Sequence, residues 1–178
     1  MTPEDRPAGA NVHYLEQGVD LIRRLNDEIY SNRTESPYPG GVGAQFRHCL
    51  DFYDCFLRGL DSGQIDYSRR ERDTRVETDR HHAIARFQAV SEQLAGLSAE
   101  HLERPVRVKA EGSARGAPEW GSSSPARELQ FLISHTIHHY ALVANLLVMQ
   151  GFDLGQEFSS FGVAPSTQEH WKQTARPQ

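Results

Sequence analysis

The sequence lacks the features that mark several common classes of protein. No stretch approaches eighteen consecutive apolar residues, and the first ten residues have neither a basic start nor an apolar centre, so we expect no membrane span or signal peptide. Positive charge is also scarce, because 19 Lys and Arg stand against 24 Asp and Glu, a formal net charge of −5. Such a balance lacks the positive field that attracts nucleic acid or anionic lipid. We therefore expect a cytoplasmic protein whose partners include neither nucleic acid nor membrane.

Cysteine is rare too, since the chain has only Cys49 and Cys55. In a helix these two positions are rotated by roughly 600°, at about 100° per residue, and so point to different sides. We expect them to be buried thiols with no disulfide between them. The glycines form neither the GxGxxG nor the GxxxxGK(S/T) pattern of phosphate-binding loops, so nucleotide-dependent chemistry has no support in the sequence.

Apolar residues at three- and four-residue spacing predict four long helices. The predicted helices cover residues 12–30, 43–60, 76–97 and 124–150. The last of them begins with Ser124, a good N-cap residue, and Pro125, which fits the first helical turn. This pattern predicts an all-α fold, a four-helix bundle in a single domain that spans 1–178 and has its core at about 12–151.

The segments between these helices carry other signals. Ser, Asn, Pro and Gly in 31–41 predict a loop, and the charged, aperiodic stretch 65–75 predicts a solvent-exposed connection. Between the third and fourth helices, 105–123 alternates valine with charged residues before a run of turn residues, which predicts a small β-hairpin. The tail 152–178 has little periodicity and is predicted to pack as extended coil.

Histidine, by contrast, is abundant, with nine in the chain. His135 and His139 lie one helical turn apart in the segment FLISHTIHHYALVANLL, so they rise about 6 Å and differ by about 40° around the helix axis. Zinc-binding HExxH helices use the same spacing, but Thr136 stands where that motif has Glu. The face that the two histidines share is predicted to point into the core. The apolar residues assigned to that face are Phe131, Leu132, Leu142, Val143 and Leu146.

A third histidine can complete a metal site. His48 shares a helix face with Phe52 and Phe56 in the predicted second helix, so it is also expected to point into the core. Burying imidazoles without partners costs on the order of 1 to 3 kcal/mol each, which a metal ion would offset. We predict that His48, His135 and His139 bind a divalent ion, with water in the remaining position. Such an ion lowers the pKa of water toward neutrality.

Other polar residues near these histidines are given lesser roles. His138 lies about 60° from His135 and about 100° from His139 around the helix, so it is expected to orient a ligand or to transfer protons. Asp51 and Asp54 follow the first histidine and are expected to be solvated acids rather than partners of an imidazole. The sequence identifies no general acid or base.

The context of these histidines resembles a known family. FRHxLDFY around His48, followed about 87 residues later by SHTIHHY, is similar to the DinB-like (DinB/YfiT) superfamily of metal-dependent enzymes, and the similarity covers most of the chain. The resemblance implies a four-helix bundle that holds a divalent metal on one histidine of the second helix and an HxxxH pair of the fourth. Matched position by position, these are His48, His135 and His139. It also implies a homodimer.

Two classes of function remain open. As an enzyme, which the resemblance implies, the protein is a metal-dependent hydrolase in which metal-activated water attacks a small-molecule substrate, or alternatively a metal-dependent low-molecular-weight thiol S-transferase. The other class is a non-catalytic, stress-associated metal-binding module. Structural zinc sites are normally closed by four protein ligands, and the three visible here favour an open, reactive site. Zinc, nickel, iron and manganese are all candidates, and loops at 37–41, 67–73 and 152–161 are expected to select the substrate.

Overall fold

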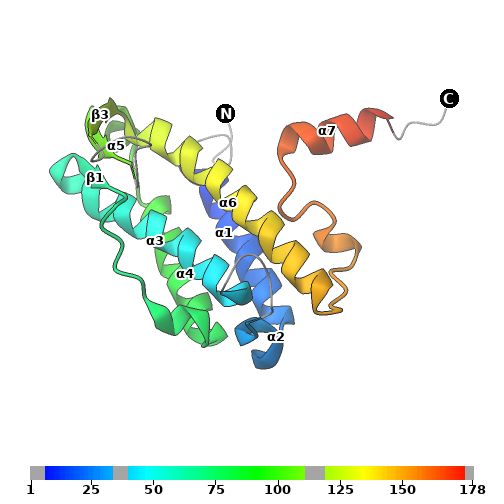
Figure 1. Ribbon diagram of the computed structural model, residues 1–178. Coiled ribbons are helices and arrows are strands. Elements are labelled where there is room, and N and C mark those ends of the chain that lie inside the picture. The colour runs from blue at the N-terminus through cyan, green and yellow to red at the C-terminus, as the bar shows by residue number, and fades with distance from the viewer. Residues whose placement is uncertain (1–6, 34–39, 111–118, 175–178) are drawn as a thin grey trace.

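The computed structural model describes residues 7–33, 40–110 and 119–174, which form a mainly helical protein with a small three-stranded sheet (Figure 1). The α-helices are α1 (Pro7–Arg24), α2 (Asp27–Ser31), α3 (Gly41–Ser62), α4 (Arg80–Ala95), α5 (Ala99–Glu103), α6 (Pro125–Met149) and α7 (Pro165–Thr174). The strands are β1 (Gln64–Asp66), β2 (Val106–Lys109) and β3 (Trp120–Ser123), and two short 3₁₀ helices are η2 (Thr74–Glu77) and η3 (Gln156–Phe158). The prediction of a helical chain is confirmed, and the sheet is larger than the predicted hairpin.

The four long helices enclose one hydrophobic core. α1 packs against α4 and α6, and α3 packs against the same two helices, so each long helix contacts two of the others. Figure 1 shows α3 and α6 running alongside each other. All four helices supply fully buried side chains, among them Leu15, Phe46, Phe87 and Leu129. The contact between α3 and α6 is the one that brings the three predicted metal ligands together.

Short polar side chains set where the helices begin. Ser124 caps α6 by accepting a hydrogen bond from the backbone N–H of Arg127, as predicted. The single helix predicted over 12–30 instead divides in two. The cause is Asn26, whose side chain accepts a hydrogen bond from the backbone N–H of Ile29 and so starts α2 as a separate helix.

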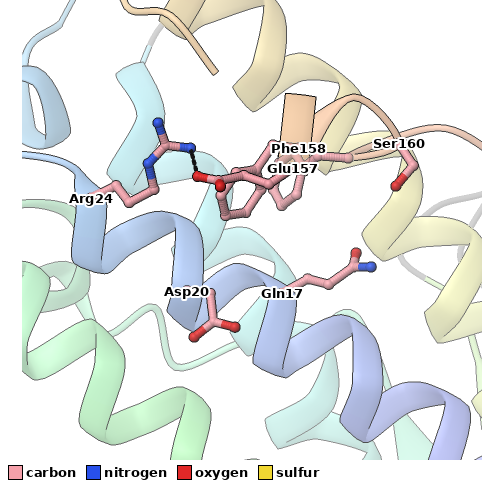
Figure 2. Close-up of a pocket in the computed structure, with 7 residues that line it drawn as sticks. Gln17, Asp20, Arg24, Glu157, Phe158 and Ser160 are labelled. Atoms are coloured by element: carbon pink, nitrogen blue, oxygen red, sulfur yellow. Dashed lines mark ion pairs between the residues drawn. The ribbon is translucent and has the colours of Figure 1, made fainter. Parts of the chain in front are cut away.

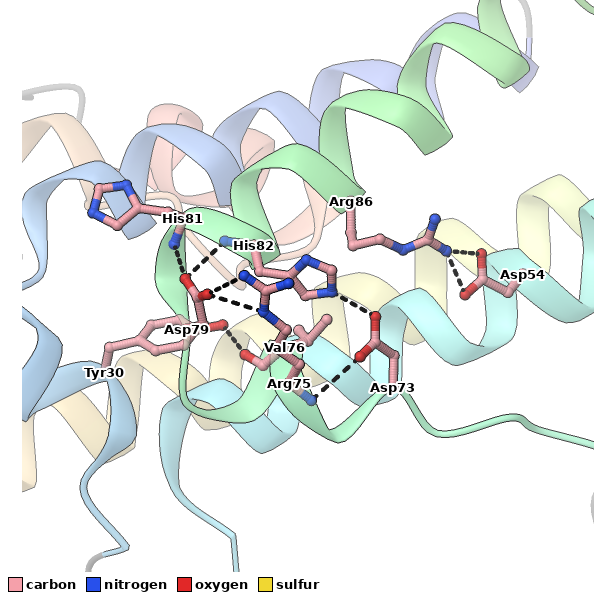
Figure 3. A network of polar contacts seen from close by, with 9 residues as sticks. All are labelled: Tyr30, Asp54, Asp73, Arg75, Val76, Asp79, His81, His82 and Arg86. Atoms are coloured by element: carbon pink, nitrogen blue, oxygen red, sulfur yellow. Dashed lines mark hydrogen bonds and ion pairs between the residues drawn. The ribbon is translucent and has the colours of Figure 1, made fainter.

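The start of α4 lies in a network of polar contacts (Figure 3). The helix begins after η2 rather than at the predicted position 76, because the Asp79 carboxylate accepts hydrogen bonds from the backbone N–H groups of His81 and His82. Val76 is buried in η2, and its carbonyl accepts a hydrogen bond of 2.7 Å from Tyr30 Oη. The turn that precedes α4 is therefore fixed to α2.

The sheet has the strand order β1-β2-β3. β2 and β3 pair antiparallel, with Val106 opposite Ser123 and Lys109 opposite Trp120, as the hairpin prediction requires; the turn between them lies at 111–118, outside the described residues. β1 pairs in parallel with β2 and buries Ile65 completely, so the prediction of a solvent-exposed connection there is wrong. The charged residues that follow this strand conceal its apolar character in the sequence.

The C-terminal segment is not the extended coil that its sequence predicts, because it forms η3 and α7. Figure 2 shows a pocket between α1 and this segment, where Arg24 forms an ion pair of 2.8 Å with Glu157. The Arg24 guanidinium also donates to the carbonyl of Leu154 and lies over the rings of Phe152 and Phe158. These contacts attach the segment to α1.

α6 is the one helix in the described part of the chain that is long and apolar enough to cross a membrane. Its most apolar 18-residue window has a mean hydropathy of 1.3, and 33% of that window is buried. Core helices of soluble proteins meet the same criterion, so length and composition alone are weak evidence for a membrane span. In this structure α6 packs against α1 and α3.

Candidate metal centre

Three histidines from two helices converge at the contact between α3 and α6. One ring nitrogen each of His48, His135 and His139 lies within 4.8 Å of the other two. The ring centroids are 5.0 Å apart for His48 and His135, 4.4 Å for His48 and His139, and 4.5 Å for His135 and His139. Residues that are far apart in the sequence therefore form one cluster, at the positions singled out by their helical spacing.

The cluster lies at the edge of the core rather than at its centre. His135 and His139 are half-buried, whereas Thr136 and Tyr140, each one residue further along α6, are fully buried. Leu132, Val143 and Leu146 are buried as predicted, but the buried face extends toward Thr136 and Tyr140 rather than to the two histidines, a displacement of less than one residue, or under about 100° of rotation. The Thr136 hydroxyl fixes this rotation, since it lies 3.2 Å from Tyr53 Oη in the interior. The displacement leaves the histidines accessible to a small ligand.

Burial and mutual repulsion keep the three imidazoles neutral. Desolvation is the main cause, and it lowers the pKa of His48 and His135 to about 3 and that of His139 to about 4. Neighbouring charges add to this effect, namely His139 and Arg70 for His48, and His138 for His139. Near neutral pH the rings therefore keep the lone pairs that a metal ion needs.

Gln45 orients one of the three rings. Its side-chain oxygen lies 2.7 Å from Nδ1 of His139. Because an amide oxygen only accepts hydrogen bonds, Nδ1 carries the proton and Nε2 keeps its lone pair. Metal-binding histidines are commonly held in this way. Gln45 was not predicted from the sequence, where its position one turn before His48 is the only signal.

Arg70 contacts another of the rings. Its Nη1 atom lies 2.7 Å from Nδ1 of His48, and a guanidinium only donates, so Nδ1 is the acceptor. A metal ion bound to Nδ1 of His48 would displace the Arg70 donor. A metal ion bound to Nε2 would require a proton on Nδ1, and two donors, Nδ1–H and the Arg70 guanidinium, would then face each other. In both cases the contact between Arg70 and His48 has to be given up before the ring can bind an ion.

The donor set otherwise fits a divalent transition metal. Nδ1 of His135 is buried and has no hydrogen-bond partner among the described residues, which costs about 1 to 3 kcal/mol unless a ligand or water satisfies it. Nitrogen ligands of a tetrahedral ion lie roughly 3.4 Å apart, given bonds of about 2.0–2.1 Å. The present separations need only small side-chain movements to reach that value. Neutral imidazoles suit zinc, nickel and iron well.

The other singled-out residues lie outside the cluster. His138 is exposed, with its ring centroid 5.1 Å from that of His139. Asp51 is 3% exposed and pairs with Arg47, so the prediction of a solvated acid is wrong for this residue. Asp54 is partly buried and accepts two hydrogen bonds from an arginine of α4. As predicted, the cysteines of α3 are free and buried, and burial raises the pKa of both thiols.

Of the three loops expected to select the substrate, 67–73 reaches the cluster through Arg70. The segment 152–161 packs on α1, so its assignment to the substrate site is not supported by these contacts. Most of 37–41 lies outside the described residues, and its last two positions begin α3.

The fold and the cluster together define a class, a helical protein with an open group of three histidines between two of its long helices. The family model of the DinB superfamily matches residues 19–143, a span that contains all three histidines. The chain therefore belongs to the DinB superfamily. It is also 31% identical over 109 residues to "FK506-binding protein 5" of Rhizopus delemar. That alignment covers 61% of this chain and 28% of the relative, so the chain matches just over a quarter of the relative's length.

Proposed function

We propose that this protein holds a divalent metal ion on His48, His135 and His139 and is a metal-dependent hydrolase of a small-molecule substrate. The observation that carries the proposal is the convergence of three neutral imidazoles from α3 and α6, with ligand atoms within 4.8 Å of one another. Membership of the DinB superfamily supports the metal. In this proposal α1, α3, α4 and α6 act as the four-helix bundle that carries the site.

The chain's own residues have distinct tasks in such a reaction. A bound divalent ion supplies a Lewis acid that lowers the pKa of water and polarises a substrate carbonyl. Gln45 holds the tautomer of His139 that leaves Nε2 available. Phe52 packs against the ring of His135, with centroids 4.1 Å apart, and keeps water from that side. His138, exposed beside His139, is placed to move protons between the site and solvent.

Two other functions would use the same cluster. A low-molecular-weight thiol transferase needs the same three ligands, with the thiol in the open position. A non-catalytic, stress-associated module would hold the ion without a reaction. Within the described residues the group of candidate ligands has three members, and a site with three protein ligands suits catalysis better than a purely structural role.

Cobalt substitution separates these functions. The cobalt protein is treated with a panel of small thiols while its visible spectrum is recorded, and the metal-loaded protein is assayed against a panel of esters and amides. We expect an unchanged cobalt spectrum and cleavage of at least one ester or amide, lost in His135→Ala and retained in the matched variant His81→Ala on α4. A spectrum that shifts with thiols, without cleavage, would instead support the transferase. A stable cobalt site with neither response would support the module.

A further inference from the structure

A cavity of about 380 Å³ lies beside the histidine cluster, and His135 forms part of its wall. Its volume falls at the lower end of the range of small-molecule sites, about 300–1,000 Å³. The other walls come from α3, from the residue that follows β1, from β2 and from the first half of α6. A ligand in this cavity would therefore touch both the sheet and the histidine-bearing helices.

Three aromatic rings line the cavity next to His135. The ring of Phe52 stacks on that of Tyr67 at 5.2 Å, and the ring of Phe131 lies 5.5 Å from Tyr67 and 6.0 Å from Phe52. His135 continues this surface, at 4.1 Å from Phe52. Phe52 and Tyr67 are almost completely buried, so their rings are held in place by the surrounding core. Such a surface suits a flat or branched apolar group.

The charged groups of the cavity are of two kinds. Glu128 is buried, and both of its carboxylate oxygens accept hydrogen bonds, from Tyr67 Oη at 3.0 Å and from Ser123 Oγ at 2.5 Å. Each of its two oxygens thus already has one hydrogen-bond partner within the protein. Arg127 is exposed at the cavity, and its guanidinium forms no hydrogen bond or ion pair with another described residue. The charge available to a ligand is therefore positive.

We propose that this cavity binds the substrate of the histidine site, and that the substrate is a small carboxylate with an apolar body. The apolar body lies against Phe52, Tyr67 and Phe131, the carboxylate lies toward Arg127, and the reacting group lies toward His135. The substrate role depends on the proposed function, whereas binding of such a molecule to the cavity does not. The two claims can therefore be tested separately.

The test uses 3-phenylpropionate as a probe for the full chain, both stripped of metal and loaded with zinc, with affinity measured by ligand-observed NMR titration. Propionate lacks the ring, and 3-phenylpropan-1-ol lacks the charge. We expect 3-phenylpropionate to bind about tenfold or more tightly than propionate, because burying a phenyl group contributes about 1.5–3 kcal/mol. It should also bind about two- to fivefold more tightly than the alcohol.

Variants of the cavity residues test whether 3-phenylpropionate binds in the cavity. Val108→Trp fills the space and Phe131→Ala removes part of the wall, and each should weaken the binding of 3-phenylpropionate by about tenfold. Arg127→Gln should abolish the advantage of the carboxylate over the alcohol, whereas Arg23→Gln, an exposed arginine on α1, should not. Circular dichroism checks that each variant is folded. If Val108→Trp does not fold, the other two cavity variants still decide the result.

Each outcome bears on one of the two claims. Equal affinity for propionate and 3-phenylpropionate, or binding that is unaffected by the cavity variants, would overturn the cavity proposal even if the protein holds metal. Ring- and charge-dependent binding in a protein that refuses every divalent metal would support the cavity as a carboxylate site and overturn the metal-dependent function. Probe binding with a retained metal supports both.

Discussion

At the scale of single residues, two side chains beside the histidines decide which ring nitrogens are available. Gln45 accepts a hydrogen bond from Nδ1 of His139 and leaves its Nε2 free to bind an ion. Arg70 donates to Nδ1 of His48, so the lone pair of Nδ1 is engaged and the ring proton lies on Nε2. The contact with Gln45 prepares His139 to bind a metal ion, whereas the contact with Arg70 hinders His48 from binding one.

This opposition makes Arg70 a residue whose removal should strengthen metal binding. Arg70→Gln removes the positive charge beside His48 and replaces the guanidinium with a weaker, neutral donor. We therefore expect divalent metal to bind about tenfold more tightly, the scale of effect that neighbours of metal ligands exert. Competition with a chelating dye of known affinity measures the change. Arg69→Gln, next to it and exposed, is the matched control and should leave the affinity unchanged. Unchanged or weaker binding in Arg70→Gln would contradict the interpretation.

The lowered pKa values of the histidines predict a pH-dependent stability of the metal-free protein. The rings titrate near pH 6.5 in the unfolded chain and near pH 3 to 4 in the folded one, so between these values the unfolded chain binds more protons. The free energy of unfolding should therefore fall as pH drops from about 6.5 to about 4. Partial exposure of the rings reduces the size of the effect.

Urea denaturation of chelator-treated protein across this pH range measures the effect. His135→Gln should show a smaller fall in unfolding free energy, because Gln does not titrate, whereas His81→Gln should match the wild type. The Asp and Glu residues are present in all three proteins, so their contribution to the pH dependence of the unfolding free energy cancels in the comparison. A wild type and a His135→Gln variant with the same pH slope would show that the buried ring is not responsible.

At the scale of elements, α3 organises the site, because it carries His48, Gln45 and Phe52 and packs on α6, the sheet and η2. Gly59 permits the close approach of α3 to the sheet: a Cβ there would meet the carbonyl oxygen of Gln64 at 2.6 Å. Since Tyr67, which lines the cavity, directly follows β1, this contact also helps to position one wall of the cavity.

Gly59→Ala should therefore destabilise the protein although alanine is the better helix former. In an open helix the change would stabilise by roughly 0.5–1 kcal/mol, but here the methyl group forces α3 and β1 apart, for which we expect a net loss of about 1–3 kcal/mol. Urea denaturation measures it. Gly96→Ala is the control, because a Cβ there meets nothing closer than 3.5 Å and its φ of −77° suits alanine. Equal stability of the Gly59 variant and the wild type would show that the contact is loose.

The helices and strands also show which features of the structure can be predicted from the sequence. The start of α6 can be predicted because Ser124 and Pro125 act locally. β1 cannot, because its three residues are defined by pairing with β2 some forty positions later, and the charged residues around Ile65 suggest exposure. The three histidines are found from helical spacing alone. Their neighbours Gln45 and Arg70 are not, since those contacts exist only after α3, α6 and the segment beyond β1 have packed.

At the scale of the whole molecule, the protein presents a helical scaffold with its candidate site on one side and exposed apolar residues at the end of α6. Val148 is 63% exposed and Met149 is 61% exposed, and the C-terminal helix α7 contributes Trp171, which is 51% exposed. In Figure 1 α7 stands apart from the four long helices. Contiguous exposed apolar side chains, such as the adjacent Val148 and Met149, commonly mark contacts between proteins.

We expect the protein to be a homodimer, as the family resemblance implies, with the end of α6 in the contact. Light scattering coupled to size-exclusion chromatography should give twice the chain mass of 20.1 kDa. Met149→Glu should shift the protein toward the monomer, because a charge in an apolar contact is costly, whereas Ser134→Glu, exposed on the same helix, should not. A wild type of 20.1 kDa at every concentration would contradict the prediction.

The central claim is that His48, His135 and His139 hold one divalent metal ion. Elemental analysis of the purified full chain by mass spectrometry, before and after loading with zinc, nickel, iron or manganese, tests it most directly. We expect close to one equivalent of one of these metals, lost when any of the three histidines is replaced by alanine and retained in His81→Ala. A wild-type protein that carries no metal and refuses all four, or alanine variants that keep a full equivalent, would contradict the claim.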